Sequence, residues 1–354
     1  MRVLVAGSGG SSGWPEPGCR CASCLRQAAA GNVRVRSSVI VDGRVGVGAG
    51  GAAGGAGRAE GYRVRALGES SWDITGPDGE RLLYAGGPGA APEPPRDAAP
   101  YDIAFLDLLG QPAHLGWLRA RGLITADTVT AVASADHRVP SEAELERRCG
   151  FWRVRLVRDG ETVSAIRSVQ KGLEPRRVLV LGGARSGKSE RAELRLAGEP
   201  EVTYAAAGLG GGGSAGDPEW AARVAAHRAR RPAWWRTAET TDLAGLLAAA
   251  RGAVLIDGIG TWLAAVLDEC GAWEDWDAAR DKLAGRIAGL IGAWRQTRAH
   301  VVAVSDETGL GVVPATPAGR RFRDELGRLN QALAAESEEA ELIVAGRVLP
   351  LDAG

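Results

Sequence analysis

Short apolar runs alternate with longer amphipathic segments through the second half of the chain. The apolar runs predict strands over residues 177–181, 202–206, 253–257, 301–305 and 340–344. The segments around them have helical spacing and predict helices over residues 188–197, 218–230, 241–250, 261–268, 273–297 and 317–337. This alternation is typical of an α/β domain with a mostly parallel sheet covered on both faces. A ligand of such a sheet binds at the carboxyl ends of its strands.

The first half of the chain has shorter apolar runs, separated by turns rich in Gly, Pro and Asp. Strands are predicted at RVLVA (residues 2–6), YRVRAL, SWDITG and ERLLYAG, and the segments YDIAFLDLLG, TVTAVASAD and FWRVRLVRDGETVSAI complete a β-rich domain. Residues 45–57 are almost all Gly, Ala and Val and predict a loop, as does the Pro-rich stretch 86–100. We therefore expect a β-rich domain over residues 1–169, a linker over 170–176 and an α/β domain over 177–354.

Length, charge and composition mainly exclude certain classes of protein. A chain of 354 residues fits two domains, and a net charge of +0 gives no electrostatic reason to bind nucleic acid or an anionic membrane. No apolar stretch is long enough to span a bilayer, and the N-terminus lacks the apolar segment of a signal peptide. Five cysteines, three of them close together, do not resemble a secreted disulfide framework. We expect a cytoplasmic protein.

A glycine-rich turn between the first strand and first helix of the second half carries the strongest chemical signal. The sequence GGARSGKS fits G-x-x-x-x-G-K-[ST], in which backbone N–H groups curl around phosphate oxygens. Lys188 would supply a cation to the outer phosphates, and Ser189 would ligate Mg²⁺. The following helix directs its positive end to the same place. The motif predicts a nucleoside triphosphate site without separating kinase, ATPase and GTPase. Its loop residues are Gly182, Gly183, Ala184, Arg185, Ser186 and Gly187.

A histidine among arginines is a candidate nucleophile. His227 lies near the end of a predicted helix and is followed by Arg228, Arg230 and Arg231. Nearby positive charge opposes protonation of the imidazole, and neutral imidazole is a nucleophile. The arginines would also hold phosphates. A solvated basic helix end explains the same residues, and on these residues alone it is the favoured interpretation.

Two acidic strand ends add to the predicted site. Asp257 ends a buried strand, where an acid in P-loop proteins commonly assists Mg²⁺. Capping of the next helix is the alternative role. Asp306 and Glu307 end another strand and lead into a Gly-rich loop at the same sheet edge.

Taken together, these segments resemble the bifunctional adenosylcobinamide kinase / adenosylcobinamide-phosphate guanylyltransferases of cobalamin biosynthesis. The motifs that carry the resemblance are LGGARSGKS, HRARRPAWWRTAE, LIDGIGTWL, VSDETGLGVVP and GRRFRDELGRLNQALA, in the family's order. The resemblance implies a RecA-like P-loop fold, GTP and ATP as substrates, adenosylcobinamide as acceptor and a homo-oligomer.

The resemblance also implies two reactions. The γ-phosphate of ATP or GTP goes to the hydroxyl of the aminopropanol arm of adenosylcobinamide. A histidine then attacks the α-phosphate of GTP, and GMP passes from the histidine to the phosphorylated cobinamide to give adenosylcobinamide-GDP. His227 matches the nucleophile, with Lys188 as the second catalytic residue. Besides Gly182 to Ser189, the matching nucleotide-binding positions are Ala207, Gly208, Leu209, Arg228, Ala229, Arg230, Arg231, Glu239 and Asp257.

The chain departs from the family pattern at three points. Asp306 stands where relatives usually have Asn, and Gly258 stands where a larger residue is common. The loop GLGGGGSAG before His227 is unusually rich in glycine. These departures predict weaker turnover or altered nucleotide contacts rather than a different reaction.

The first half resembles metallo-β-lactamase-fold phosphodiesterases, through GSGGSSGWPEPGCRCASCLRQ and RVRSSVIVDG. Those hydrolases need an H-x-H-x-D-H motif, which none of the four histidines here can form, so we expect a degenerate domain without metal-dependent hydrolysis. The resemblance implies that Cys19, Cys21, Cys24 and His137 bind a structural Zn²⁺. The alternative is three reduced cysteines left in the loop of a decayed domain.

Two other functions remain open on the sequence. One is a P-loop kinase of another small metabolite, in which His227 is structural. The other is a nucleotide-binding regulatory protein without transferase activity, for which the motif departures are the supporting feature.

Overall fold

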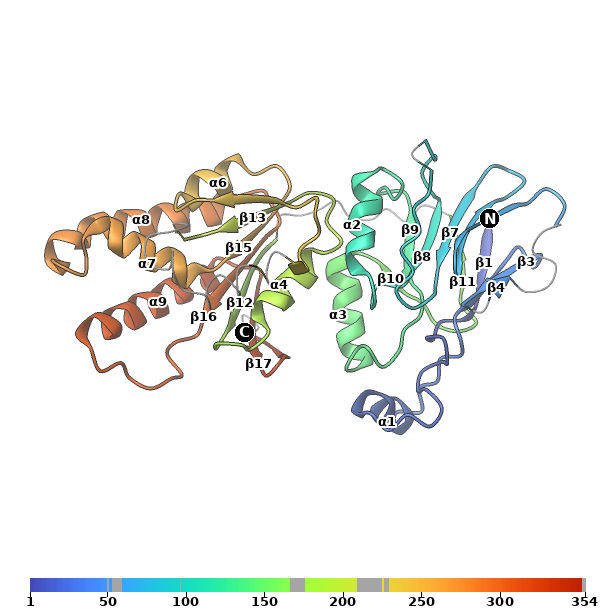
Figure 1. Ribbon diagram of the computed structural model, residues 1–354, viewed down its shortest axis with the longest axis horizontal. Coiled ribbons are helices and arrows are strands. Elements are labelled where there is room, and N and C mark those ends of the chain that lie inside the picture. The colour runs from blue at the N-terminus through green and yellow to red at the C-terminus, as the bar shows by residue number, and fades with distance from the viewer. Residues whose placement is uncertain are drawn as a thin grey trace. The chain divides into compact units, whose positions relative to one another are not determined.

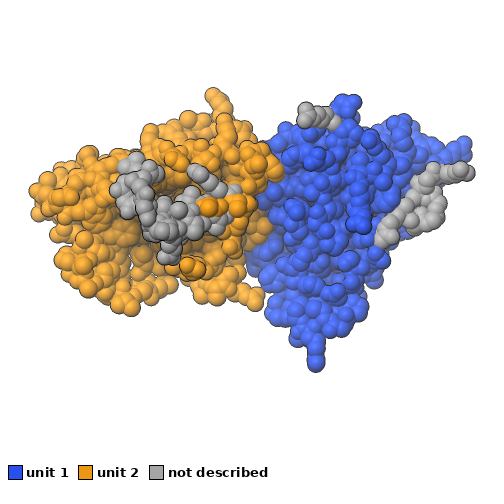
Figure 2. All heavy atoms as spheres, viewed as in Figure 1, with its two compact units in different colours: residues 1–171, 197–200 blue, residues 172–196, 201–354 orange. Residues whose placement is uncertain are grey.

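The computed structural model describes residues 1–49, 51–52, 59–95, 97–165, 176–208, 225 and 229–351, with the backbone alone at 51–52 (Figure 1). The chain forms two compact units (Figure 2). The first comprises Met1–Lys171 and Ala197–Pro200, and the second comprises Gly172–Leu196 and Glu201–Gly354. Among the described helices, none is long and apolar enough to cross a membrane.

Two sheets enclose the core of the first unit. One has the order β11-β1-β2-β3-β4, and its neighbouring strands are antiparallel. The other has the order β10-β9-β8-β7-β6-β5, parallel from β10 to β7 and antiparallel from β7 to β5. Apolar side chains from both sheets, such as Val3, Val39, Ile74 and Phe105, form one buried cluster. The strands are β1 (Arg2–Gly7), β2 (Ser38–Val41), β3 (Val45–Gly48), β4 (Gly51–Ala52), β5 (Arg63–Gly68), β6 (Ser71–Thr75), β7 (Arg81–Ala85), β8 (Ile103–Leu106), β9 (Val129–Val132), β10 (Arg155–Leu156) and β11 (Thr162–Ser164).

The first unit contains more regular structure than the sequence pattern predicts. Strand β3 and the short β4 lie within residues 45–57, where a loop was expected; Val45 and Val47 are buried and β3 pairs with β2. The prediction was wrong there because two alternating valines make a strand only when a neighbouring strand supplies the hydrogen bonds. Three helices, α1 (Ala22–Ala29), α2 (Pro112–Ala120) and α3 (Glu142–Trp152), were also missed. Phe151 and Trp152 end α3 and belong to no strand.

A seven-stranded sheet forms the centre of the second unit, with the order β14-β13-β15-β16-β12-β17-β18. All neighbouring pairs are parallel except β17 with β18. The five predicted strands are present, and the edge strands β14 and β18 were missed. The strands are β12 (Arg177–Gly182), β13 (Val202–Ala206), β14 (Arg236–Glu239), β15 (Ala253–Asp257), β16 (Val301–Asp306), β17 (Glu339–Val344) and β18 (Arg347–Pro350).

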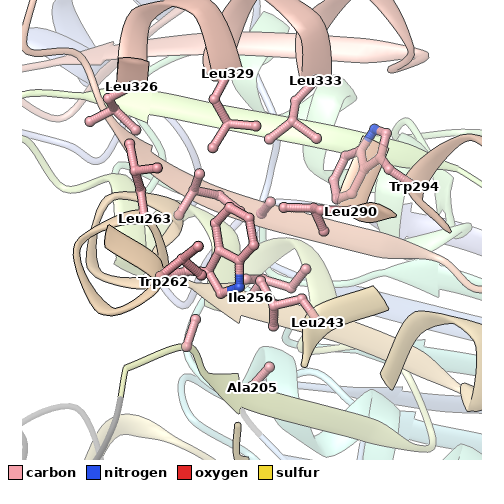
Figure 3. Packing of buried hydrophobic residues seen from close by; sticks show 14 of the residues in the cluster. Ala205, Leu243, Ile256, Trp262, Leu263, Leu290, Trp294, Leu326, Leu329 and Leu333 are labelled. Atoms are coloured by element: carbon pink, nitrogen blue, oxygen red, sulfur yellow. The ribbon is translucent and has the colours of Figure 1, made fainter. Parts of the chain in front are cut away.

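Helices of the second unit supply the remaining core. Figure 3 shows side chains of α7, α8 and α9, among them Trp262, Leu290 and Leu329, packed with Ile256 of the sheet. The helices are α4 (Lys188–Leu196), α6 (Leu243–Ala249), α7 (Ile259–Cys270), α8 (Trp276–Gln296) and α9 (Pro317–Ala335). The predicted helix 218–230 lies outside the described residues except for 225, 229 and 230, which are helical.

Candidate nucleotide site and candidate metal centre

The glycine-rich loop connects the end of β12 to the start of α4, as the motif predicts. Gly182 is the last residue of β12, and Lys188 and Ser189 are the first two of α4. The Gly346 N–H donates to the Ser186 carbonyl (2.8 Å) and the Glu307 N–H donates to the Gly182 carbonyl (3.2 Å), which ties the loop to its neighbours. The loop therefore lies at the carboxyl ends of parallel strands, and these two hydrogen bonds hold its backbone in place.

Two loop positions require glycine for different reasons. A Cβ on Gly182 would lie 2.4 Å from Ser186 Oγ and 2.8 Å from the Ile343 carbonyl oxygen, so no side chain fits. Gly187 has φ of +95°, a conformation that other residues rarely adopt. The Oγ atom of Ser186 is buried and has no hydrogen-bond partner among the described residues, so a phosphate oxygen would satisfy it.

Lys188 contacts a carboxylate at the same sheet edge. Its Nζ atom lies 2.9 Å from Asp306 Oδ1 and 3.1 Å from the Gly183 carbonyl oxygen. The contact arises because β12 and β16 are adjacent and in register at Gly182 and Asp306. The Asn330 amide of α9 donates to the Asp306 carbonyl (3.1 Å) and its carbonyl accepts from Ser305 Oγ (2.6 Å), which holds this strand end. A phosphate bound by Lys188 would compete with Asp306 for the ammonium group.

Ser189 and Asp257 lie together, although 67 residues separate them in the chain. Ser189 Oγ donates to Asp257 Oδ1 (3.4 Å), and the Tyr204 hydroxyl donates to Asp257 Oδ2 (2.6 Å). Burial raises the pKa of Tyr204, and the adjacent Asp257 charge raises it further. Tyr204 therefore stays protonated and orients the carboxylate. A hydroxyl and a carboxylate oxygen at a phosphate loop are the donors that Mg²⁺ prefers.

The arginines that follow the predicted nucleophile approach the same edge. The Arg231 guanidinium lies 3.6 Å from the centre of the Tyr204 ring, a cation–π contact. Arg230 forms an ion pair with Glu193 of α4 at 3.0 Å, and this hydrogen bond raises the pKa of Arg230. Glu239 ends β14 in register with Ala206, which is itself in register with Asp257. Ala207 and Gly208 directly follow β13, and Ala229 is helical. His227, Leu209 and Arg228 lie outside the described residues.

A buried ion cluster positions the helix that carries Lys188. Arg191 Nη2 and Arg195 Nη1 of α4 donate to Glu341 Oε1 of β17 at 2.8 and 2.7 Å. Arg195 also pairs with Glu339. Burial alone would raise the pKa of Glu341, but the two guanidinium groups hold it below its usual value. The cluster fixes α4 against β17, next to β12 in the sheet.

Comparison with known proteins decides the family. The model of the cobinamide kinase / cobinamide phosphate guanyltransferase family matches residues 178–351. The bifunctional adenosylcobalamin biosynthesis protein CobU of Salmonella typhimurium is 40% identical over 183 residues, which cover 48% of this chain and 96% of that protein. The chain belongs to this family.

Two further relatives agree with the assignment to the CobU family. The bifunctional adenosylcobalamin biosynthesis protein CobP of Pseudomonas aeruginosa is 43% identical over 181 residues, 49% of this chain and 96% of that protein. CobU of Escherichia coli is 38% identical over 178 residues, 48% of this chain and 96% of that protein. Each alignment covers about half of this chain, and the family model matches only residues of the second half.

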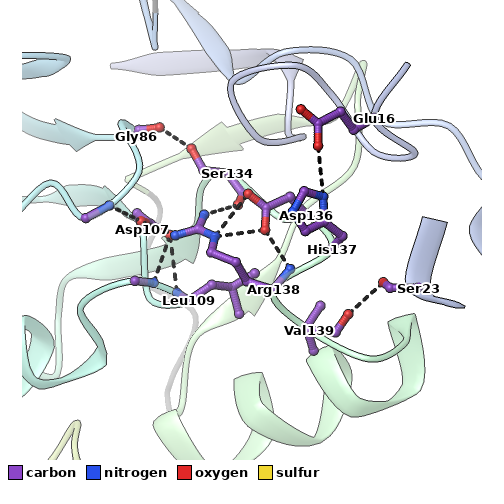
Figure 4. A network of polar contacts seen from close by, with 12 residues as sticks. Glu16, Ser23, Gly86, Asp107, Leu109, Ser134, Asp136, His137, Arg138 and Val139 are labelled. Atoms are coloured by element: carbon purple, nitrogen blue, oxygen red, sulfur yellow. Dashed lines mark hydrogen bonds and ion pairs between the residues drawn. The ribbon is translucent and has the colours of Figure 1, made fainter. Parts of the chain in front are cut away.

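Outside the CobU-family residues, the first unit holds the candidate metal centre. One ligand atom from each of Cys19, Cys21, Cys24 and His137 lies within 4.8 Å of the other three. His137 Nδ1 lies 3.1 Å from Glu16 Oε2 (Figure 4), which leaves Nε2 as the ring nitrogen for a metal. Burial raises the pKa of the Cys24 thiol to about 11, whereas the Cys24 N–H lowers the pKa of Cys21 by donating to its sulfur. Three sulfurs and an imidazole are a ligand set typical of structural zinc.

The residues next to His137 form a separate ion network. Arg138 donates to Asp136 Oδ1 (2.8 Å) and to Asp107 Oδ2 (2.8 Å), as Figure 4 shows. Asp107 also accepts from the Gly89 N–H (2.6 Å). These contacts tie Asp107, which follows β8, to the loop that follows β9. They hold His137 within a fixed turn near the three cysteines.

Sequence reasoning left several residues out of the predicted site. Tyr204 and Glu193 were not considered. Asp306 was placed at the sheet edge and treated as a departure from the family pattern, but its contact with Lys188 was not predicted. A polar-tipped aromatic residue in a buried strand was the one signal that pointed to Tyr204, because a buried phenol usually has a hydrogen-bond partner. Glu193 carries no local signal, since its partner is 37 residues away.

Proposed function

We propose that this protein is an adenosylcobinamide kinase and adenosylcobinamide-phosphate guanylyltransferase of cobalamin biosynthesis. It transfers the γ-phosphate of ATP or GTP to the hydroxyl on the aminopropanol arm of adenosylcobinamide. It then transfers GMP from GTP, through a GMP–histidine intermediate on His227, to give adenosylcobinamide-GDP. Family membership supports the reaction class, and the grouping of Lys188, Ser189 and Asp257 at one sheet edge supports a nucleotide site. We further infer a RecA-like fold for the second unit and a homo-oligomer in the cytoplasm.

In this proposal, each residue of the nucleotide site has a role that suits its chemistry. Lys188 binds the outer phosphates, and the backbone N–H groups of the loop hold the others. Ser189 and Asp257 would hold Mg²⁺, which neutralises phosphate charge when bound. Tyr204 orients Asp257, and Arg231 adds positive charge near it. In the second reaction the His227 nitrogen forms a bond to the α-phosphorus of GTP while pyrophosphate leaves, and the acceptor phosphate then displaces the histidine.

Mass spectrometry of the intact protein tests the proposal. After incubation with GTP and Mg²⁺, we expect a mass gain that matches one GMP, labile in acid and absent from His227→Ala. Addition of phosphorylated adenosylcobinamide should discharge the adduct. A protein that binds GTP but never gains GMP would support a kinase of another metabolite, and one that also fails to phosphorylate any corrinoid would support a regulatory protein.

For the first unit we propose a degenerate metallo-β-lactamase-like domain with a structural Zn²⁺. The sandwich of two sheets is compatible with that fold, and the gathering of Cys19, Cys21, Cys24 and His137 supports the metal. The Glu16 carboxylate beside His137 fits the usual partner of a zinc-bound imidazole. Zinc bound there would link α1 to the turn after β9.

Zinc content tests the metal proposal directly. The purified protein is expected to hold about one zinc per chain, and Cys24→Ser is expected to lose most of it. Elemental analysis gives the stoichiometry, and thermal unfolding with and without a chelator gives the stabilisation. Cys149→Ser is the matched control, because Cys149 is buried in α3 and lies outside the cluster. A zinc-free wild-type protein after growth with added zinc would contradict the proposal.

A further inference from the structure

The loop between β16 and α9 presents apolar side chains to solvent. Leu310, Val312 and Val313 are 79%, 94% and 61% exposed among the described residues. Scattered exposed apolar residues are ordinary, but three within four positions of one loop concentrate exposed apolar surface, and such a concentration is typical of a binding surface. The sequence has no charged residue between Glu307 and Arg320, so the loop is also uncharged.

Hydrogen bonds to the backbone hold this loop in shape. Arg323 of α9 donates to the Gly309 carbonyl (2.8 Å), and Arg320 donates to the carbonyls of Pro314 (3.0 Å) and Ala315 (2.7 Å). At its start, the Gly309 N–H donates to Glu307 Oε1 (2.8 Å). The loop thus displays its apolar side chains in a preorganised form, which lowers the entropic cost of binding a ligand.

The same loop is continuous with the phosphate site. It begins directly after Asp306, whose carboxylate contacts Lys188, and the Glu307 N–H bonds to the last residue of β12. A substrate whose hydroxyl receives phosphate at Lys188 has the rest of its mass at this edge of the sheet. Three residues separate Asp306 from Leu310, a short distance for a ligand with an extended arm.

We propose that Leu310, Val312 and Val313 form the docking surface for the macrocycle of the corrinoid substrate, an inference that rests on the proposed function. Adenosylcobinamide is a broad macrocycle with methyl groups and neutral amides on its rim, and its aminopropanol arm carries the reacting hydroxyl. An apolar, uncharged surface complements such a ligand, because burying the side chains removes apolar area from water at no cost in charge desolvation. The arm then reaches from this surface to the phosphate held by Lys188.

Equilibrium dialysis of adenosylcobinamide against Leu310→Ser/Val312→Ser tests the inference. The Kd for adenosylcobinamide is expected to rise at least about tenfold, while the Kd for GTP and the yield of GMP adduct change less than about twofold. The matched control is Val33→Ser/Val35→Ser, two exposed valines of the first unit (69% and 51%), which should leave every value unchanged. Light scattering follows the oligomeric state of each variant.

Each alternative outcome has a distinct meaning. An unchanged Kd for adenosylcobinamide in the loop variant overturns the inference and leaves the proposed function intact. Dissociation of an oligomer by the loop variant also overturns it and assigns the patch to a second copy of the chain. A wild-type protein that binds GTP but no adenosylcobinamide overturns the inference and the proposed function together.

Discussion

Lys188→Ala is expected to lower the rate of phosphoryl transfer to adenosylcobinamide by about 100- to 1,000-fold. Lys188 begins α4 beside the glycine-rich loop, where its ammonium group would neutralise charge on the transferred phosphate. Three nearby arginines are already engaged, because Arg191 and Arg195 are bound to Glu341 and Arg230 is bound to Glu193. Steady-state kinetics with ATP and with GTP give kcat and KM for each variant.

The matched control for this prediction is Lys282→Ala. Lys282 is exposed on α8 and donates to the Glu269 carbonyl (3.0 Å), so its loss should leave kcat unchanged. A Lys188→Ala protein with kcat within tenfold of the wild type would show that the glycine-rich loop is not the site of phosphoryl transfer.

Glu341→Ala is expected to destabilise the second unit by about 3–5 kcal/mol. The substitution removes the carboxylate that pairs with both Arg191 and Arg195, whose side chains are 5% and 2% exposed. It would leave two buried guanidinium groups without the carboxylate they share, and Glu339, which pairs with Arg195, also pairs with Arg176. For a unit of this size we expect a fall in melting temperature of about 10 °C or more, measured by circular dichroism.

An exposed ion pair provides the comparison for Glu341. Glu201 pairs with Arg236 at 2.6 Å, but the side chains are 52% and 66% exposed, so Glu201→Ala should cost less than about 1 kcal/mol. Equal effects of the two substitutions would contradict the importance of the buried cluster. The pH dependence has a defined sign. Because the pKa of Glu341 is lowered in the folded state, its contribution to stability is complete above the unfolded-state pKa and is lost as the pH falls from there through the folded-state pKa.

Local periodicity was sufficient to predict most of the second unit. Five of its seven strands follow from short, mainly apolar runs, because central strands buried on both faces have few polar residues, although β17 also contains Glu339 and Glu341. The two missed strands lie at the sheet edges. Arg236–Glu239 has no buried residue, and β18 exposes Arg347, Leu349 and Pro350, so neither has the apolar pattern of a central strand.

The first unit was harder to predict for a related reason. Segment 45–52 is rich in small residues, and segment 112–120 begins with Pro. Both segments carry little periodic signal. Pairing with β2 makes β3 a strand, and burial of Leu115 and Leu118 accompanies the formation of α2. In such segments the neighbouring elements decide the local structure, and the amino-acid pattern is a weak guide.

By itself, the sequence determined the family, the glycine-rich loop and its place between a strand and a helix, because these depend on residues close together in the chain. Only the tertiary structure decided which distant groups meet. The order of the strands brings Asp306 into contact with Lys188. It also brings Asp257 to Ser189 and Tyr204. In the same way, Glu341 meets Arg191 and Arg195. Strand order depends on how whole elements pack together, and no local period in the sequence encodes it.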